Sequence, residues 1–148
     1  MIRYVHTNLV ARDWRRLADF YIAVFDCREV PPQRRQQGAW LEAGSGVVGL
    51  SLEGMHLRLP GWGEQGPTLE IFSYRPLLES EPTVTRRGLG HLAFQVDDVA
   101  EMLKKALCHG GKALGEPVQQ QIDGVGLLTF VYLADPEGNV IEIQRWSQ

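Results

Sequence analysis

Residues 87–98 constrain the fold of this chain most, because a strand there passes directly into the start of a helix. Every second residue from Leu92 to Val96 is apolar, which is the period of a strand with one apolar face. Asp98 supplies an N-cap, and the apolar residues after it recur at helical spacing. His91 therefore stands at the start of a strand, on the face opposite the one that the helix must cover.

The same order of elements occurs at the N-terminus. Residues 2–10 predict a strand with His6 on its polar face, and a helix is predicted over residues 13–25. The two histidines are separated by the same number of residues as the two helix starts. A fixed offset of this kind indicates an internal repeat.

Three further strands are predicted after each helix. In the first half we expect a strand end and turn over residues 31–37, and then a hairpin whose strands cover 39–43 and 47–52. A loop rich in Gly and Pro over residues 55–67 and a last strand over 68–74 follow. In the second half we expect a helix over residues 98–109 and strands over 112–119, 127–133 and 140–146. The chain is thus predicted to be α+β, with two βαβββ modules. We expect a single domain over residues 1–148, with modules 1–75 and 88–148 joined by a linker, 76–87.

Composition excludes several classes of protein. The formal net charge of −3 gives no support for nucleic-acid binding through a basic surface. No apolar run approaches the roughly 18 residues that a membrane-spanning helix needs, and no signal-peptide pattern opens the chain. Two cysteines, Cys27 and Cys108, form neither a metal-binding CxxC pair nor a disulfide framework. We therefore expect a cytoplasmic protein without nucleic-acid or membrane partners.

Four residues with metal-binding side chains fall at equivalent places in the two halves. His6 and His91 stand on the first strands, and Glu70 and Glu142 on the last strands, all on the face that the helices leave uncovered. A carboxylate buried on such a face costs several kcal/mol unless it is paired or binds a cation. Taken singly, each residue is ordinary on a half-exposed sheet. The repeated His-to-Glu pair instead favours a site for a divalent transition metal.

This plan resembles the vicinal oxygen chelate superfamily, also called the glyoxalase, bleomycin-resistance and extradiol dioxygenase superfamily. The resemblance covers essentially the whole chain and is carried by His6 with residues 13–25, by Thr68-Leu69-Glu70-Ile71-Phe72, by residues 88–98, and by residues 135–143. It implies that both sheets curve around one funnel, with the helices outside. It also implies that His6, Glu70, His91 and Glu142 are the ligands of a divalent metal ion (Ni, Zn, Mn or Fe) in that funnel.

The resemblance further implies chemistry on a small oxygen-chelating substrate. A metal held by two His and two carboxylates acts as a Lewis acid that stabilises an enediolate or enolate. Glu142 and Glu70 are then the catalytic carboxylates, and Glu142 is our choice for the proton-moving base. A homodimer is expected, because βαβββ modules leave sheet edges that need partners.

The ligand set is most similar to that of glyoxalase I, a lactoylglutathione lyase. Residues 71–74 and 139–142 depart from the runs typical of that enzyme. An extradiol-type dioxygenase, an epimerase and a thiol transferase of the same superfamily therefore stay open. A non-catalytic small-molecule-binding or resistance protein is the alternative from a different functional class.

Substrate-binding residues are predicted from their neighbourhood. Asn8 and Gln95 lie on the same strand faces as the two histidines, and Arg58 and Trp62 lie with His56 in the inserted loop, which could act as a lid. Paired arginines, 15–16, 34–35 and 86–87, could bind a substrate carboxylate or phosphate, although solvated surface is the simpler interpretation.

Overall fold

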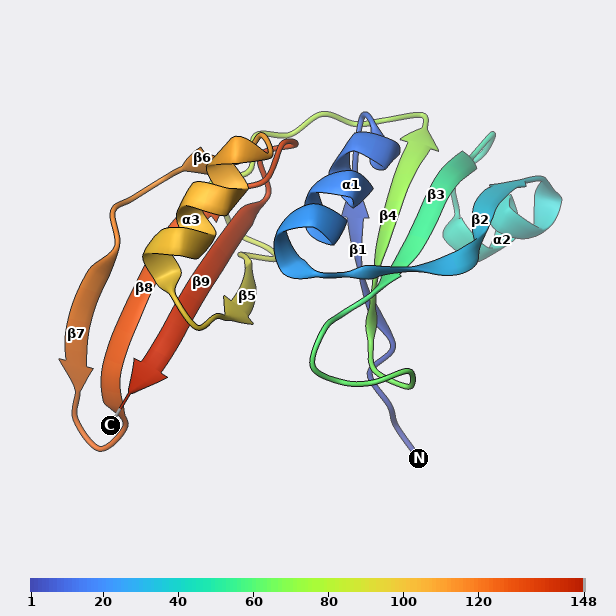
Figure 1. Cartoon of the computed structure of the whole chain (residues 1–148). Coiled ribbons are helices and arrows are strands. Elements are labelled where there is room, and N and C mark those ends of the chain that lie inside the picture. Colours follow the sequence, from blue (N-terminus) through green and yellow to red (C-terminus); the bar gives the residue numbers. More distant parts are fainter. Residues whose placement is uncertain (148) are drawn as a thin grey trace. The chain divides into compact units, whose positions relative to one another are not determined.

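The computed structural model describes residues 1–147 and has the α+β architecture expected from the sequence. The chain divides into two compact units: unit 1 covers Met1–Glu79, and unit 2 begins at Ser80. Each unit has one sheet with a helix packed on one face of it (Figure 1). The boundary falls inside the predicted linker, residues 76–87. The single funnel enclosed by both sheets stays a prediction.

Unit 1 follows the order strand, helix, then three strands, with one short helix inserted. Its elements are β1 (His6–Val10), α1 (Trp14–Phe25), β2 (Arg28–Gln37), α2 (Ala39–Ser45), β3 (Ser51–Arg58) and β4 (Thr68–Arg75). The sheet order is β1-β4-β3-β2. β1 pairs with β4 in parallel, and the other pairs are antiparallel. The first and last strands of the unit are therefore neighbours.

Unit 2 repeats this topology. Its elements are β5 (Leu92–Gln95), α3 (Val99–Cys108), β6 (Lys112–Ala113), β7 (Val118–Ile122), β8 (Gly126–Ala134) and β9 (Val140–Ser147). β5 pairs with β9 in parallel, and β8 pairs with β9, β7 and β6 in antiparallel fashion. The strand predicted over residues 112–119 is thus two short strands. Pro117 lies between them, and proline cannot donate to a sheet hydrogen bond.

Both principal helices form where caps and apolar spacing predict them. The Asp13 side chain accepts a hydrogen bond from the Arg16 backbone N–H, and Asp98 caps α3 in the same way. The apolar side of α1 is buried against the sheet, and its buried residues are Leu17, Ala18, Phe20, Tyr21, Val24 and Phe25. Within residues 1–147, no helix combines the length and apolar character needed to cross a membrane.

The hairpin predicted over residues 39–52 is wrong, because its first half is the helix α2. Gly46, expected in a hairpin turn, instead ends this helix in the left-handed conformation with φ 73°. β3 also continues through residues 55–58, where the sequence predicts a loop. His56 and Arg58 are therefore sheet residues, and no lid contains them.

Gly54 is required where β3 and β4 pair. A Cβ atom placed there would lie 2.1 Å from the Ile71 carbonyl oxygen and 2.4 Å from a ring carbon of Phe72. We expect Gly54→Ala to destabilise the protein by about 3 kcal/mol, the upper end of overpacking costs. For a unit of this size, that corresponds to a fall of roughly 12–24 °C in Tm.

Gly44→Ala is the matched control, since Gly44 lies in α2 and a Cβ there would meet nothing within 4 Å. Thermal melting followed by circular dichroism should show this control at or slightly above the wild-type Tm, because Ala favours helix over Gly. Equal melting of both variants would contradict the steric argument.

Candidate functional site

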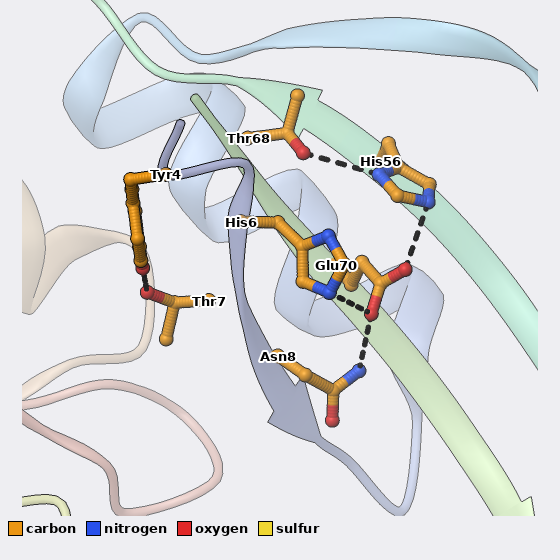
Figure 2. Close-up of polar contacts among 7 residues, drawn as sticks. All are labelled: Tyr4, His6, Thr7, Asn8, His56, Thr68 and Glu70. Carbon is orange, nitrogen blue, oxygen red and sulfur yellow. Dashed lines mark hydrogen bonds and ion pairs between the residues drawn. The ribbon is translucent and has the colours of Figure 1, made fainter. Parts of the chain in front are cut away.

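Unit 1 brings one predicted histidine and one predicted glutamate together. His6 begins β1, and Glu70 lies in the neighbouring strand β4, where it pairs with Asn8. Nε2 of His6 lies 3.1 Å from Oε2 of Glu70 (Figure 2). The His6 side chain is 39% exposed and that of Glu70 16%, so the carboxylate is the more enclosed partner.

His56 completes this cluster from the other side of β4. It pairs with Glu70 in the β3–β4 register, and its Nε2 lies 3.1 Å from Oε1 of that carboxylate. Its Nδ1 lies 3.1 Å from Oγ1 of Thr68. The pKa of His56 is lowered, chiefly because burial disfavours the charged ring, although the Glu70 charge acts in the opposite direction. A neutral His56 therefore donates from Nε2 to Glu70 and accepts the Thr68 hydroxyl at Nδ1.

Both oxygens of the Glu70 carboxylate are engaged. Nδ2 of Asn8 donates to Oε2 at 3.3 Å, next to His6, while His56 holds Oε1 (Figure 2). The Glu70 charge also contributes, after burial, to a raised pKa of the Tyr74 hydroxyl on the same strand. Glu70 is thus a fixed carboxylate with three side-chain partners.

Unit 2 carries the equivalent pair with a different neighbour. His91 directly precedes β5, and its Nε2 lies 3.1 Å from Oε2 of Glu142 in β9. Tyr132 of β8 pairs with Glu142 in register, the position that His56 has in unit 1. Burial, the Glu142 charge and a hydrogen bond to Glu142 raise the pKa of the Tyr132 hydroxyl. The His91 and Tyr132 rings lie edge to face, with centroids 5.2 Å apart.

The donor set of each unit fits two adjacent ligands of one divalent metal. Two ligands at right angles around an ion, with bonds of about 2.1 Å, lie about 3.0 Å apart. The nitrogen and oxygen of each His–Glu pair are separated by nearly that distance, 3.1 Å. In the part of the chain that the structure describes, no group of three or more His, Cys, Asp or Glu side chains is arranged to hold a metal ion. Each pair therefore supplies at most half of a four-ligand set.

The predicted substrate-binding residues differ in their surroundings. Asn8 contacts Glu70, and Arg58 lies on the same face of β3 as His56. Trp62 lies in the loop after β3 and is 72% exposed, so unit 1 does not bring it into the cluster. Gln95 ends β5 on the face of His91 and is exposed.

His56 and Tyr132 are the cluster residues that sequence reasoning missed. Alternation over residues 55–58 could have placed His56 in a strand. The apolar residues, however, fall at even-numbered positions before Gly54 and at odd-numbered positions after it. Leu52 is buried before the change, and Met55 and Leu57 are buried after it. This phase change made the segment look irregular.

Comparison with known proteins settles the family. A family model described as the glyoxalase/bleomycin resistance protein/dioxygenase superfamily matches residues 3–143. The chain belongs to this superfamily. The resemblance inferred from the two histidine-bearing strands and from the Asp135–Asn139 turn is thereby confirmed. No curated protein sequence matches the chain significantly.

Solved structures of superfamily members share the fold. A glyoxalase family protein from Bacillus cereus gives a TM-score of 0.84 at 18% identity, covering 100% of this chain and 96% of that chain. A glyoxalase/bleomycin resistance protein from Albidiferax ferrireducens gives a TM-score of 0.62 at 18% identity, covering 96% and 98%. The fosfomycin resistance protein FosX from Listeria monocytogenes gives 0.55 at 13% identity, covering 99% and 93%, and its structure contains Mn(II) and a sulfate ion.

Proposed function

We propose that this superfamily member is a metal-dependent, glyoxalase-like isomerase or lyase acting on a small oxygen-chelating substrate. The observation that carries the proposal is the repeated His–Glu pair, His6 with Glu70 and His91 with Glu142, at the same separation in both units. In this proposal the two pairs together hold one divalent metal ion, within one chain or across a homodimer. Mn(II) in the related FosX supports a divalent ion.

The four side chains have different roles in this proposal. When bound, the metal supplies Lewis-acid polarisation of a substrate carbonyl. His6 and His91 provide neutral imidazole ligands, and Glu70 is held in place by its three partners. Glu142 also has an imidazole beside it, that of His91, but Tyr132 and Ala93 take the register positions that His56 and Asn8 have beside Glu70. With fewer partners to hold it, Glu142 is the carboxylate left to take a proton from the substrate carbon.

The second candidate is binding without turnover. Its support is that proteins of similar fold include one described as a glyoxalase/bleomycin resistance protein and a fosfomycin resistance protein. The dioxygenase, epimerase and thiol-transferase chemistries of the superfamily also stay open. The homodimer and the cytoplasmic location stay predictions from the sequence.

Metal analysis of the purified full chain separates these functions. The chain is stripped with a chelator and titrated with Ni, Zn, Mn and Fe(II), and bound metal is measured by mass spectrometry. If each His–Glu pair is one half-site, we expect about one ion for every two half-sites, that is, about one ion per chain. The loaded protein is then assayed with hemithioacetals, acyl-CoA thioesters and catechols, and we expect turnover of a hemithioacetal. Failure to bind any of the four metals would refute the proposal and favour the binding protein.

A further inference from the structure

We infer that the site face of unit 1 also binds an oxyanion, through Arg34 and Arg58. The ligand class is a small molecule that carries a carboxylate or phosphate group. The site face is the sheet surface that presents His6, His56 and Glu70. The inference deepens the proposed function and rests on it in one respect, namely that the anion belongs to the substrate of the same site.

The strand register places both arginines beside His56. Arg58 follows it by two residues on β3 and so lies on the same face. Arg34 of β2 pairs with Gly54, which precedes His56 by two residues on that face. Two residues span about 7 Å along a strand, and neighbouring strands are about 4.8 Å apart. The backbones of both arginines therefore lie within the length of a small substrate from His56.

The charges of these two arginines lack a carboxylate partner in residues 1–147. Four of the seven other arginines of unit 1 form ion pairs with glutamates, and these pairs are Arg12–Glu79, Arg15–Glu29, Arg28–Glu64 and Arg35–Glu53. Arg34 instead donates to the Pro32 carbonyl, and Arg58 to the Gly66 carbonyl. Carbonyl acceptors satisfy hydrogen bonds but leave the positive charges without a counter-charge.

Arg58 shows a second, independent sign of a missing ligand. Its Nε is buried and has no hydrogen-bond partner within the described chain. A buried donor of a charged group is costly when left unpaired, so Arg58 Nε calls for an acceptor that the described chain does not supply. An oxyanion that accepts from a guanidinium would satisfy this donor and the charge together.

Glu70 supplies one negative charge against the two positive charges of Arg34 and Arg58, and its ion pairs are with His6 and His56. It is the only carboxylate that the four strands of unit 1 place on the site face, since Glu29 and Glu53 lie on the other side. Both of its oxygens are held by His6, Asn8 and His56. The site face thus carries an excess of positive charge.

Arg35 is the matched control for Arg34. It is the next residue on β2, lies on the opposite face, and pairs with Glu53 at 3.2 Å. Removing it changes the net charge equally but leaves the site face intact. The simpler interpretation, that the Arg34–Arg35 pair is solvated surface, predicts the same effect for both residues.

The test uses the full chain in metal-free form, so that no metal can bind the probe. Isothermal titration with inorganic phosphate and, separately, with glutarate compares wild type with Arg34→Gln, Arg58→Gln and Arg35→Gln. We expect wild type to bind at least one probe. Losing one charge-assisted contact should raise Kd about tenfold or more in Arg34→Gln and Arg58→Gln. Arg35→Gln should stay within about twofold, as expected for an exposed ion pair.

The outcomes distinguish phosphate from carboxylate as the bound group, and the oxyanion site from the proposed metal-dependent function. The probe that binds more tightly identifies phosphate or carboxylate as the preferred group. No binding of either probe to wild type, or an equal loss in Arg35→Gln, would overturn the inference. Thermal melting checks the fold, and if Arg58→Gln unfolds, Arg34→Gln against Arg35→Gln decides alone. A chain that binds anions but no metal would refute the proposed chemistry and leave this inference standing.

Discussion

Glu142→Gln is expected to reduce turnover about a thousandfold while keeping metal affinity within about tenfold to a hundredfold of wild type. Gln keeps the volume and one oxygen ligand of Glu142 but removes the basic group. A general base accounts for a rate factor of that size, whereas a retained ligand oxygen preserves most of the binding. Steady-state kinetics of the metal-loaded protein and titration of the metal-free protein give the two numbers separately.

Glu70→Gln is the matched comparison, because Glu70 is the equivalent carboxylate of the other unit. Its oxygens are already fixed by His6, Asn8 and His56, so it is not the residue expected to move a proton. The loss of turnover should therefore be smaller than in Glu142→Gln. A Glu142→Gln variant that holds metal and turns over substrate normally would disprove the assignment of the base.

His6→Ala and His91→Ala are expected to lose metal and activity together. Each removes one nitrogen ligand outright, so the loss in metal affinity should exceed the ten- to hundredfold typical of changes that only reorient a ligand, at about a hundredfold or more. Both side chains are partly exposed, at 39% and 34%, so truncation should leave the fold intact. Metal titration and thermal melting measure the two effects.

His109→Ala is the control for these two variants. His109 is the C-cap of α3, where its Nδ1 contacts the Lys105 carbonyl, and it belongs to neither His–Glu pair. It should bind metal as wild type does. Normal metal binding by either His6→Ala or His91→Ala would remove that histidine from the ligand set.

The helices and the central strands follow from local signals. Asp13 and Asp98 cap helices with apolar residues at helical spacing, and apolar and polar residues alternate over residues 141–144, so each element could be predicted from its own residues. α2 could not, because a glycine that ends a helix and a glycine in a hairpin turn leave the same sequence pattern. Only the packing of the surrounding unit distinguishes the two.

The cluster around Glu70 was predictable only in part. Alternation shows on which face a side chain lies, and this was enough to select His6, Glu70, His91 and Glu142 as candidates. It does not show which strands are neighbours. His56 became a partner of Glu70 because β3 lies beside β4, an adjacency that depends on the whole sheet.

The parallel pairing of β1 with β4 also determines when in folding the half-site forms. Asn8 and Glu70 become neighbours only after the intervening chain has closed into a sheet, and closing so long a loop costs entropy before any contact repays it. We therefore do not expect a metal to nucleate this fold as zinc does in small zinc-finger domains. On the proposed function the metal would bind after folding, so we expect protein prepared in chelator to be folded and to take up metal afterwards.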